Sequence, residues 1–207
     1  MPVILVANPK GGVGKSTLST NIAGFYASRG YSVMLGDTDK QQSARNWLQL
    51  RPANVYPIGT WEIDADNIAR PPKGVSHVVL DSPAGVHGWR LKELLRMVNK
   101  VVVPLQPSMF DILATQQFLQ ELREEKHVRQ HEIEVGVVGM RVDSRTKAAE
   151  QLHRFIDQLG LPVLGYLRNT QNYVQLAAHG LTLFDVAPYR VEKDLSEWQT
   201  LTDWLLK

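Results

Sequence analysis

The stretch NPKGGVGKST, at residues 8–17, decides how this 207-residue chain is expected to fold. It directly follows a short apolar run, residues 3–7, and precedes a segment with the pattern of a helix that begins near Lys15. A bound phosphate needs converging backbone N–H groups, and glycines let the backbone approach it closely. Lys15 can reach terminal phosphates, and the Ser16 hydroxyl is placed to ligate Mg²⁺. The stretch therefore predicts a phosphate-binding loop.

The strict pattern G-x4-G-K-[ST] is not met, because Pro9 occupies the position of its first glycine. The chain instead reads K-G-G-V-G-K-S-T, which places a second lysine, Lys10, five residues before Lys15. The alternative interpretation is a glycine-rich turn that carries two surface lysines. The expected strand before the loop and helix after it favour the phosphate loop.

Apolar runs rich in β-branched residues recur along the chain and alternate with helix-length amphipathic segments. Continuous apolar runs are typical of strands buried on both faces, so we expect an α/β fold whose mostly parallel sheet has helices on both faces. The expected strands are residues 3–7, 32–35, 75–80, 101–104, 135–139 and 162–165. The expected helices are residues 15–29, 40–50, 88–97, 111–127, 145–159 and 171–179. No internal repeat or long linker divides the chain, which predicts one domain over residues 1–207.

The composition excludes several classes of protein. The chain has no Cys, so it has no disulfide framework, thiol nucleophile, Cys-ligated zinc or iron–sulfur cluster. Lys and Arg number 23 against 21 Asp and Glu, so any basic surface must be local. The apolar N-terminus lacks a basic segment, and no later run approaches the roughly 18 apolar residues of a membrane span. A soluble cytoplasmic protein is therefore expected.

Acidic residues follow the second and third expected strands. Asp37 and Asp39 come where the second strand should end, and Asp81 ends the third. Because ligands collect at the carboxyl ends of parallel strands, these carboxylates should face the phosphate loop. With Ser16, they would supply a Mg²⁺ site and a group that orients water. The alternative is that they make turns or cap helices, which is common at strand ends.

The K-G-G-x-G-K-[ST] form resembles the deviant Walker-A P-loop ATPases of the ParA/MinD family, and most closely the ParA-type partition ATPases. This resemblance implies a P-loop NTPase fold, ATP and Mg²⁺ as cofactors, and weak ATP hydrolysis that a partner stimulates. It makes Lys15 the loop lysine acting on its own nucleotide, and Lys10 the signature lysine that reaches the ATP of a second subunit. The adenine contacts remain open among three residues near the ends of the last two strands. The candidate nucleotide-binding residues are thus Lys10, Gly11, Gly12, Val13, Gly14, Lys15, Ser16, Thr17, Arg141, Arg168 and Asn169.

Three further segments resemble parts of this family. Residues 37–39 resemble switch I, where Asp39 would position the attacking water and Asp37 would neighbour the metal shell, although Lys40 stands where proline is usual. The sequence DSPAG at residues 81–85 resembles switch II, with Asp81 holding Mg²⁺ through water. Residues 104–111 resemble the proline-rich segment at the nucleotide-dependent dimer face.

The resemblance also implies non-specific DNA binding. Arg145 matches a basic position that ParA relatives use on DNA, and Lys147 and Arg154 fall near one face of the same expected helix. The alternative is an ordinary solvated helix face. A few phosphate contacts suffice for salt-sensitive binding, so the near-neutral net charge does not exclude it.

Taken together, the expected function is that of an ATP-dependent dimer on the nucleoid. It would position or partition a cargo (plasmid, chromosome or protein assembly) with a ParB-like or cargo-adaptor partner. One alternative is a MinD-like regulator that cycles on membranes; a less favoured one is a P-loop small-molecule kinase or ligase. The C-terminal segment combines an apolar stripe with acidic residues, which favours packing against the sheet over membrane binding. That stripe consists of Leu195, Trp198, Leu201, Thr202 and Leu205.

Overall fold

The computed structural model describes residues 1–64 and 67–207, and its centre is a six-stranded sheet. The strands lie in the order β2-β3-β1-β4-β5-β6, and each neighbouring pair is parallel. Their bounds are β1 Val3–Val6, β2 Val33–Asp37, β3 His77–Asp81, β4 Lys100–Leu105, β5 Glu134–Met140 and β6 Val163–Leu167. The predicted parallel sheet is confirmed.

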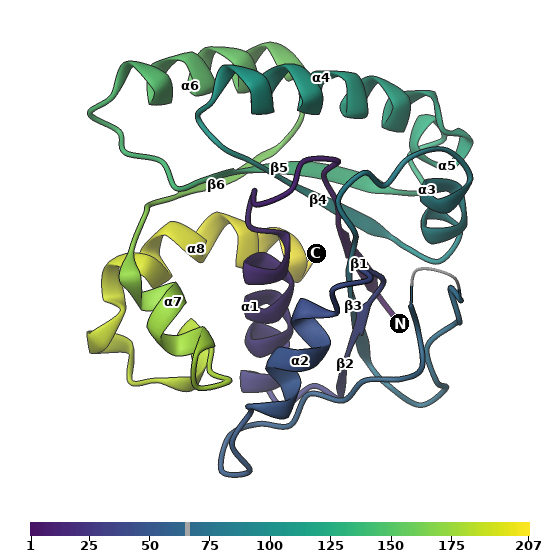
Figure 1. Ribbon diagram of the computed structural model, residues 1–207, viewed down its shortest axis with the longest axis vertical. Helices are drawn as coiled ribbons and strands as arrows, with labels where there is room; N and C mark the ends of the chain where they lie inside the picture. Colours follow the sequence, from purple (N-terminus) through teal and green to yellow (C-terminus); the bar gives the residue numbers. More distant parts are fainter. Residues whose placement is uncertain (65–66) are drawn as a thin grey trace.

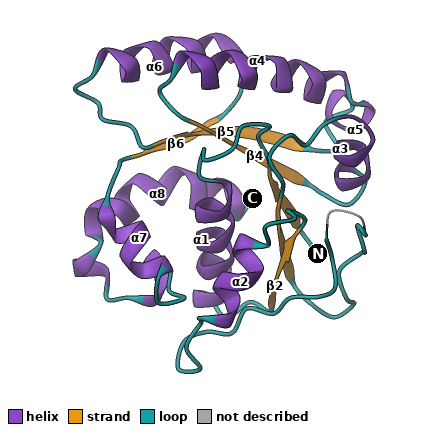
Figure 2. Cartoon of the chain, viewed as in Figure 1, coloured by secondary structure: helices purple, strands orange, loops and turns teal. Residues whose placement is uncertain are grey.

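Helices cover both faces of this sheet (Figures 1 and 2). One face carries α3 (Gly88–Leu95), α4 (Met109–Glu124) and α6 (Lys147–Leu159). The other carries α1 (Lys15–Ser28), α2 (Ser43–Gln49), α7 (Gln171–Ala177) and α8 (Glu192–Leu205). Short helical turns complete the described chain: α5 (Lys126–Arg129), η1 (Leu183–Asp185) and η2 (Pro188–Arg190).

The central strand β1 shows why the sheet is buried on both faces. Successive side chains of a strand point to opposite faces. Val3 and Leu5 belong to the core with α3, α4 and α6, whereas Ile4 and Val6 belong to the core with α1 and α8. All four are buried, so the run needs an apolar residue at every position.

All six predicted helices are present, and most differ from the prediction by a few residues at one end or both. The predicted helix over residues 111–127 was wrong at both ends, because α4 begins at Met109 and the extended backbone of Glu125 separates it from α5. The C-terminal stripe packs as expected, since Trp198, Leu201 and Leu205 of α8 are buried in the core. Within the described residues, every helix is too short or too polar to cross a membrane.

Candidate functional site

The loop at residues 8–17 leaves the carboxyl end of β1, the strand between β3 and β4. Gly12 and Gly14 have φ values of 76° and 98°, a conformation that favours glycine, and a Cβ on Gly14 would lie 2.7 Å from Met140 Cε. In the described part of the chain, no backbone N–H of residues 11–17 donates a hydrogen bond to the protein. These donors precede and begin α1, so the loop has the free N–H groups that a cradle for an anion requires.

The side chain of Lys15 is held inside this loop. The residue is 7% exposed, and its Nζ donates a hydrogen bond of 2.7 Å to the carbonyl oxygen of Lys10. Burial lowers the pKa of Lys15, and the nearby carboxylates of Asp81 and Asp39 oppose that effect. A buried cation therefore lies beside the cradle, with two carboxylates within its electrostatic reach.

Asp81 is the last residue of β3 and is 1% exposed. Its Oδ1 accepts a hydrogen bond of 3.0 Å from Ser19. Burial raises the pKa of Asp81 to about 7, and the nearby Ser16 hydroxyl opposes that rise because it favours the charged form of the carboxyl group. A hard cation favours oxygen ligands and the ionised carboxylate, so Ser16 and Asp81 together fit Mg²⁺ at this position.

Asp37, at the end of β2, has a different environment. Its Oδ2 accepts the backbone N–H groups of Ala44 and Arg45, at 2.8 and 3.1 Å, and its Oδ1 accepts that of Asp39 at 2.9 Å. Asp37 thus holds the start of α2 and the turn before it. The structure brings Asp37 beside Asp81 in the sheet register, but its oxygens are already engaged by backbone donors.

Asp39 lies in the turn that follows β2 and is half-buried. Its Oδ1 accepts the backbone N–H of Gln41 at 3.0 Å, while its Oδ2 has no hydrogen-bond partner in the described chain. In residues 1–64 and 67–207, no group of three or more His, Asp or Glu side chains could hold a metal. A cation at Ser16 and Asp81 would therefore draw its other ligands from water and phosphate.

The three residues left open for the adenine contact line one cavity. Arg141, Arg168 and Asn169 enclose about 460 Å³ beside Gly14 and Thr17 of the loop, with α7 as the opposite wall. Arg168 is not free, because its guanidinium donates to Asp194 at 2.8 Å and lies close to Glu197. The side chain of Asn169 is exposed and makes no hydrogen bond among the described residues, and Arg141 is exposed as well.

Sequence reasoning did not single out Asp194 as part of this arrangement. It is completely buried in α8, and its carboxylate binds both Arg168 and the side-chain amide of Asn172. An acid among the apolar positions of an amphipathic helix is the signal that could have indicated a buried partner. Its place in the sequence does not show which cation it meets.

The predicted DNA-binding residues lie on the surface around α6. The Arg145 side chain is 87% exposed, but it binds Asp143 in a bidentate pair with two contacts of 2.9 Å. Arg154 lies 3.8 Å from Glu150, one turn earlier on α6. Lys147, the first residue of α6, is exposed. Acidic neighbours therefore offset part of the charge of this surface.

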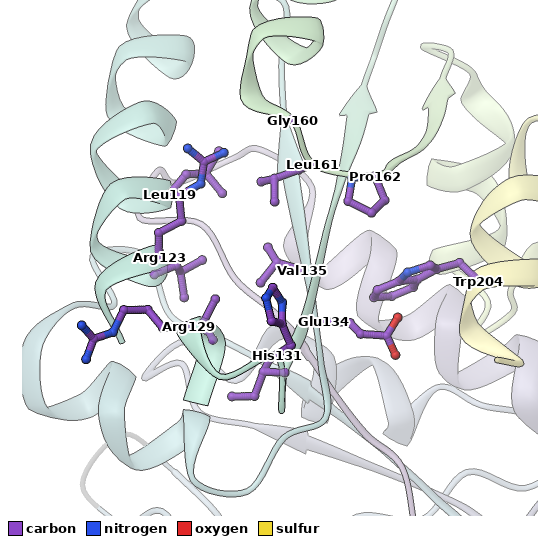
Figure 3. Close-up of a pocket in the computed structure, with 13 residues that line it drawn as sticks. Leu119, Arg123, Arg129, His131, Glu134, Val135, Gly160, Leu161, Pro162 and Trp204 are labelled. Atoms are coloured by element: carbon purple, nitrogen blue, oxygen red, sulfur yellow. The ribbon is translucent and has the colours of Figure 1, made fainter. Parts of the chain in front are cut away.

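A larger cavity, of about 510 Å³, lies at the opposite end of the sheet, where β5 begins (Figure 3). Leu119, Val135, Leu161 and Trp204 contribute to its apolar wall, and Arg129 lies at one side. None of the predicted site residues lines it. The chemistry of the loop and the carboxylates, rather than cavity size, therefore identifies the candidate site.

Comparisons with known proteins agree with this geometry. Maintenance of carboxysome distribution protein A of Halothiobacillus neapolitanus is 26% identical over 191 residues, which cover 88% of this chain and 87% of the relative. Protein ParA of Rhizobium radiobacter is 27% identical over 157 residues, or 72% of this chain and 69% of the relative.

Among solved structures, an ATP complex of McdA from Cyanothece shares the fold with a TM-score of 0.76 and 13% identity, covering 98% of this chain and 96% of the other. The profile of the CobQ/CobB/MinD/ParA nucleotide binding domain matches residues 4–183. The loop, its partner carboxylates and this match together lead to one conclusion: the chain belongs to the ParA/MinD family of nucleotide-binding proteins.

Proposed function

We propose that this protein is an ATPase that dimerises when it binds ATP·Mg²⁺, binds DNA without sequence preference, and positions a cargo with an adaptor protein. The observation that carries the proposal is the cradle of unpaired N–H groups at residues 11–17 beside buried Lys15 and the Ser16–Asp81 pair. The names of the relatives, which refer to carboxysome distribution and to ParA, support a role in positioning.

In this proposal, the residues around the loop have separate tasks. The loop amides and Lys15 neutralise the phosphates, Ser16 and Asp81 hold Mg²⁺, and the free oxygen of Asp39 orients the water that attacks. Asp37 keeps switch I in place by capping α2 rather than by binding the metal directly. Hydrolysis would be slow until a partner completes the arrangement.

Lys10 would act on the nucleotide of a second subunit. Its ammonium forms no ion pair in the described chain, whereas its backbone is fixed at both ends: Asn8 Oδ1 accepts its N–H, and its carbonyl oxygen accepts from Lys15. A free cation on a fixed backbone suits a contact across a dimer. A cation at the developing charge of phosphoryl transfer is worth about 10³–10⁵ in rate in the arginine-finger enzymes.

For the base, the proposal favours Asn169 over Arg168. The Arg168 charge is already matched by Asp194, so turning it toward a base would leave a buried carboxylate unpaired. The amide of Asn169 offers both a donor and an acceptor, which a purine edge requires. Arg141 remains available beside the same cavity.

Three variants test the proposed function. Lys15→Ala should abolish binding of a fluorescent ATP analogue, because it removes the buried cation of the loop. Lys10→Ala should keep that binding but lose the ATP-dependent dimer in light scattering, and Asp39→Ala should hold the dimer without phosphate release. Lys193→Ala, which removes an exposed lysine on α8, is the matched control. Normal ATP turnover by Asp39→Ala, or loss of nucleotide binding in Lys10→Ala, would contradict these assignments.

A further inference from the structure

Asn8 joins the phosphate loop to the segment that begins α4. The residue is fully buried, and its Nδ2 donates to the carbonyl oxygen of Pro104 at 2.7 Å and to Thr115 Oγ1 at 2.9 Å. Its Oδ1 accepts the backbone N–H of Lys10 at 2.9 Å. One buried amide therefore connects the end of β4, the second turn of α4 and the backbone of Lys10.

A second contact joins the same two segments. Gln106, between β4 and α4, donates from its Nε2 to the carbonyl oxygen of Gly12 at 2.9 Å. The first part of the loop, residues 8–12, is thus held to the connection between β4 and α4. The remaining part, residues 13–17, continues into α1 and lies beside Asp81.

The start of α4 also carries an exposed apolar patch. Met109, Phe110 and Leu113 are 53%, 79% and 55% exposed, and their spacing places them on the first two turns of the helix. Exposed apolar residues that gather beside a functional loop mark a surface that another molecule covers. In the proposed function, that molecule is the second ATP-bound subunit.

We infer that Asn8 is a positioning residue that fixes the backbone of Lys10 relative to the apolar start of α4. The inference rests on the proposed function, and it names the coupling between two parts of the dimer face. Asn8 contacts Lys10 and α4 directly, whereas it reaches Lys15 only through the carbonyl oxygen of Lys10. Losing its contacts should therefore weaken dimerisation more than it weakens nucleotide binding.

The replacement Thr115→Val tests this coupling, because it removes one hydroxyl from the connection and keeps the volume. A net hydrogen bond of this kind is worth about a tenfold change in an equilibrium constant at most. With a non-hydrolysable ATP analogue bound, we expect the association constant of the dimer to fall about three- to tenfold. Thr115→Ser should restore it. Asn8→Ala removes all three contacts and should have the larger effect. Thr202→Val is the matched control, because it removes a buried hydroxyl of α8 that lies far along the chain from the loop.

Hydrogen–deuterium exchange on the full-length protein gives a second measurement that does not require a dimer. Thr115→Val should speed exchange of the Lys10 amide, which donates to Asn8 Oδ1, together with exchange in residues 105–113, and Thr115→Ser should not. Equal loss of nucleotide affinity and dimerisation, or unchanged exchange of the Lys10 amide, would overturn the inference. If the unaltered protein forms no ATP-dependent dimer, the proposed function fails, and the exchange result alone decides whether Asn8 couples the two segments.

Discussion

At the scale of single residues, Asp81 links the chemistry of the site to the stability of the fold. Its carboxyl group is buried, and its pKa is raised from an ordinary 3.8 to about 7. Between those values the folded chain holds a proton that the unfolded chain releases, so the free energy of unfolding should fall as pH rises from about 4 to about 7. Above that range the carboxylate is charged in both states, and the free energy of unfolding stays lower by the full cost of burying that charge.

Replacing Asp81 with Asn should therefore stabilise the nucleotide-free protein. Each pKa unit corresponds to about 1.4 kcal/mol, so the rise from 3.8 to about 7 implies a gain at pH 8 on the order of 4 kcal/mol. Urea unfolding at pH 5 and pH 8 measures it, and the variant should show the smaller difference between the two. Mg²⁺-dependent ATP hydrolysis should be lost in the same variant. A variant that is less stable than the unaltered protein at pH 8 would show that Asp81 is ionised at little cost.

Asp37 and Asp81 show how far the sequence could predict the site. Both follow a buried strand, and both were expected at the carboxyl edge of the sheet, where the structure places them. The sequence left metal binding and helix capping open for both residues, and it did not indicate that Asp37 caps α2 whereas Asp81 meets Ser16 and Ser19. That difference depends on how the chain turns after each strand, which hydrophobic periodicity does not record.

At the scale of elements, an ion pair fixes α2 to the C-terminal part of the chain. Arg51, just after α2, binds both oxygens of Asp185 in η1, at 2.9 and 2.8 Å. The two side chains are 5% and 0% exposed. The guanidinium also donates to the carbonyl oxygen of Gly180, so three segments meet at one charged group.

Arg51→Met should destabilise the protein strongly, because it keeps the apolar stem and leaves Asp185 buried without a cation. Removing one partner of a buried pair costs about 3–5 kcal/mol, and urea unfolding at neutral pH measures the loss. Arg154→Met is the matched control, since its pair with Glu150 is exposed and should be worth under about 0.5 kcal/mol. Equal effects of the two replacements would mean that burial does not decide the strength of the Arg51 pair.

The elements themselves were largely predictable, and their polar connections were not. Continuous apolar runs indicated all six described strands, and the helix after the loop begins at Lys15 as expected. The pairing of Arg51 with Asp185 spans 134 positions, and the contact of Asn8 with Thr115 spans 107. A single sequence contains no local signal for such pairs. Polar residues are mostly exposed, so each of these residues is predicted to lie on the surface when its distant partner is not known.

At the scale of the whole molecule, electrostatics limits the strength of the DNA binding that we propose. The chain carries a formal net charge of +2, so attraction to DNA must come from a local surface. Around α6, Arg145, Lys147 and Arg154 face DNA in the proposed function, but Asp143 and Glu150 already neutralise two of them. Binding therefore competes with these internal pairs.

This competition predicts that removing an acid strengthens DNA binding. With at most three phosphate contacts from this surface per subunit, the slope of log K against log salt should be about −3 for each subunit that binds. Asp143→Asn frees Arg145 and should tighten binding of the ATP-bound protein to plasmid DNA, whereas Arg145→Glu should weaken it without changing dimerisation. Asp203→Asn, which removes an exposed acid on α8, controls for net charge alone. If Asp203→Asn strengthens binding as much as Asp143→Asn, then the surface around α6 is not the DNA-binding face. If lipid vesicles rather than DNA sediment with the protein and ATP, then the proposed DNA binding itself is wrong.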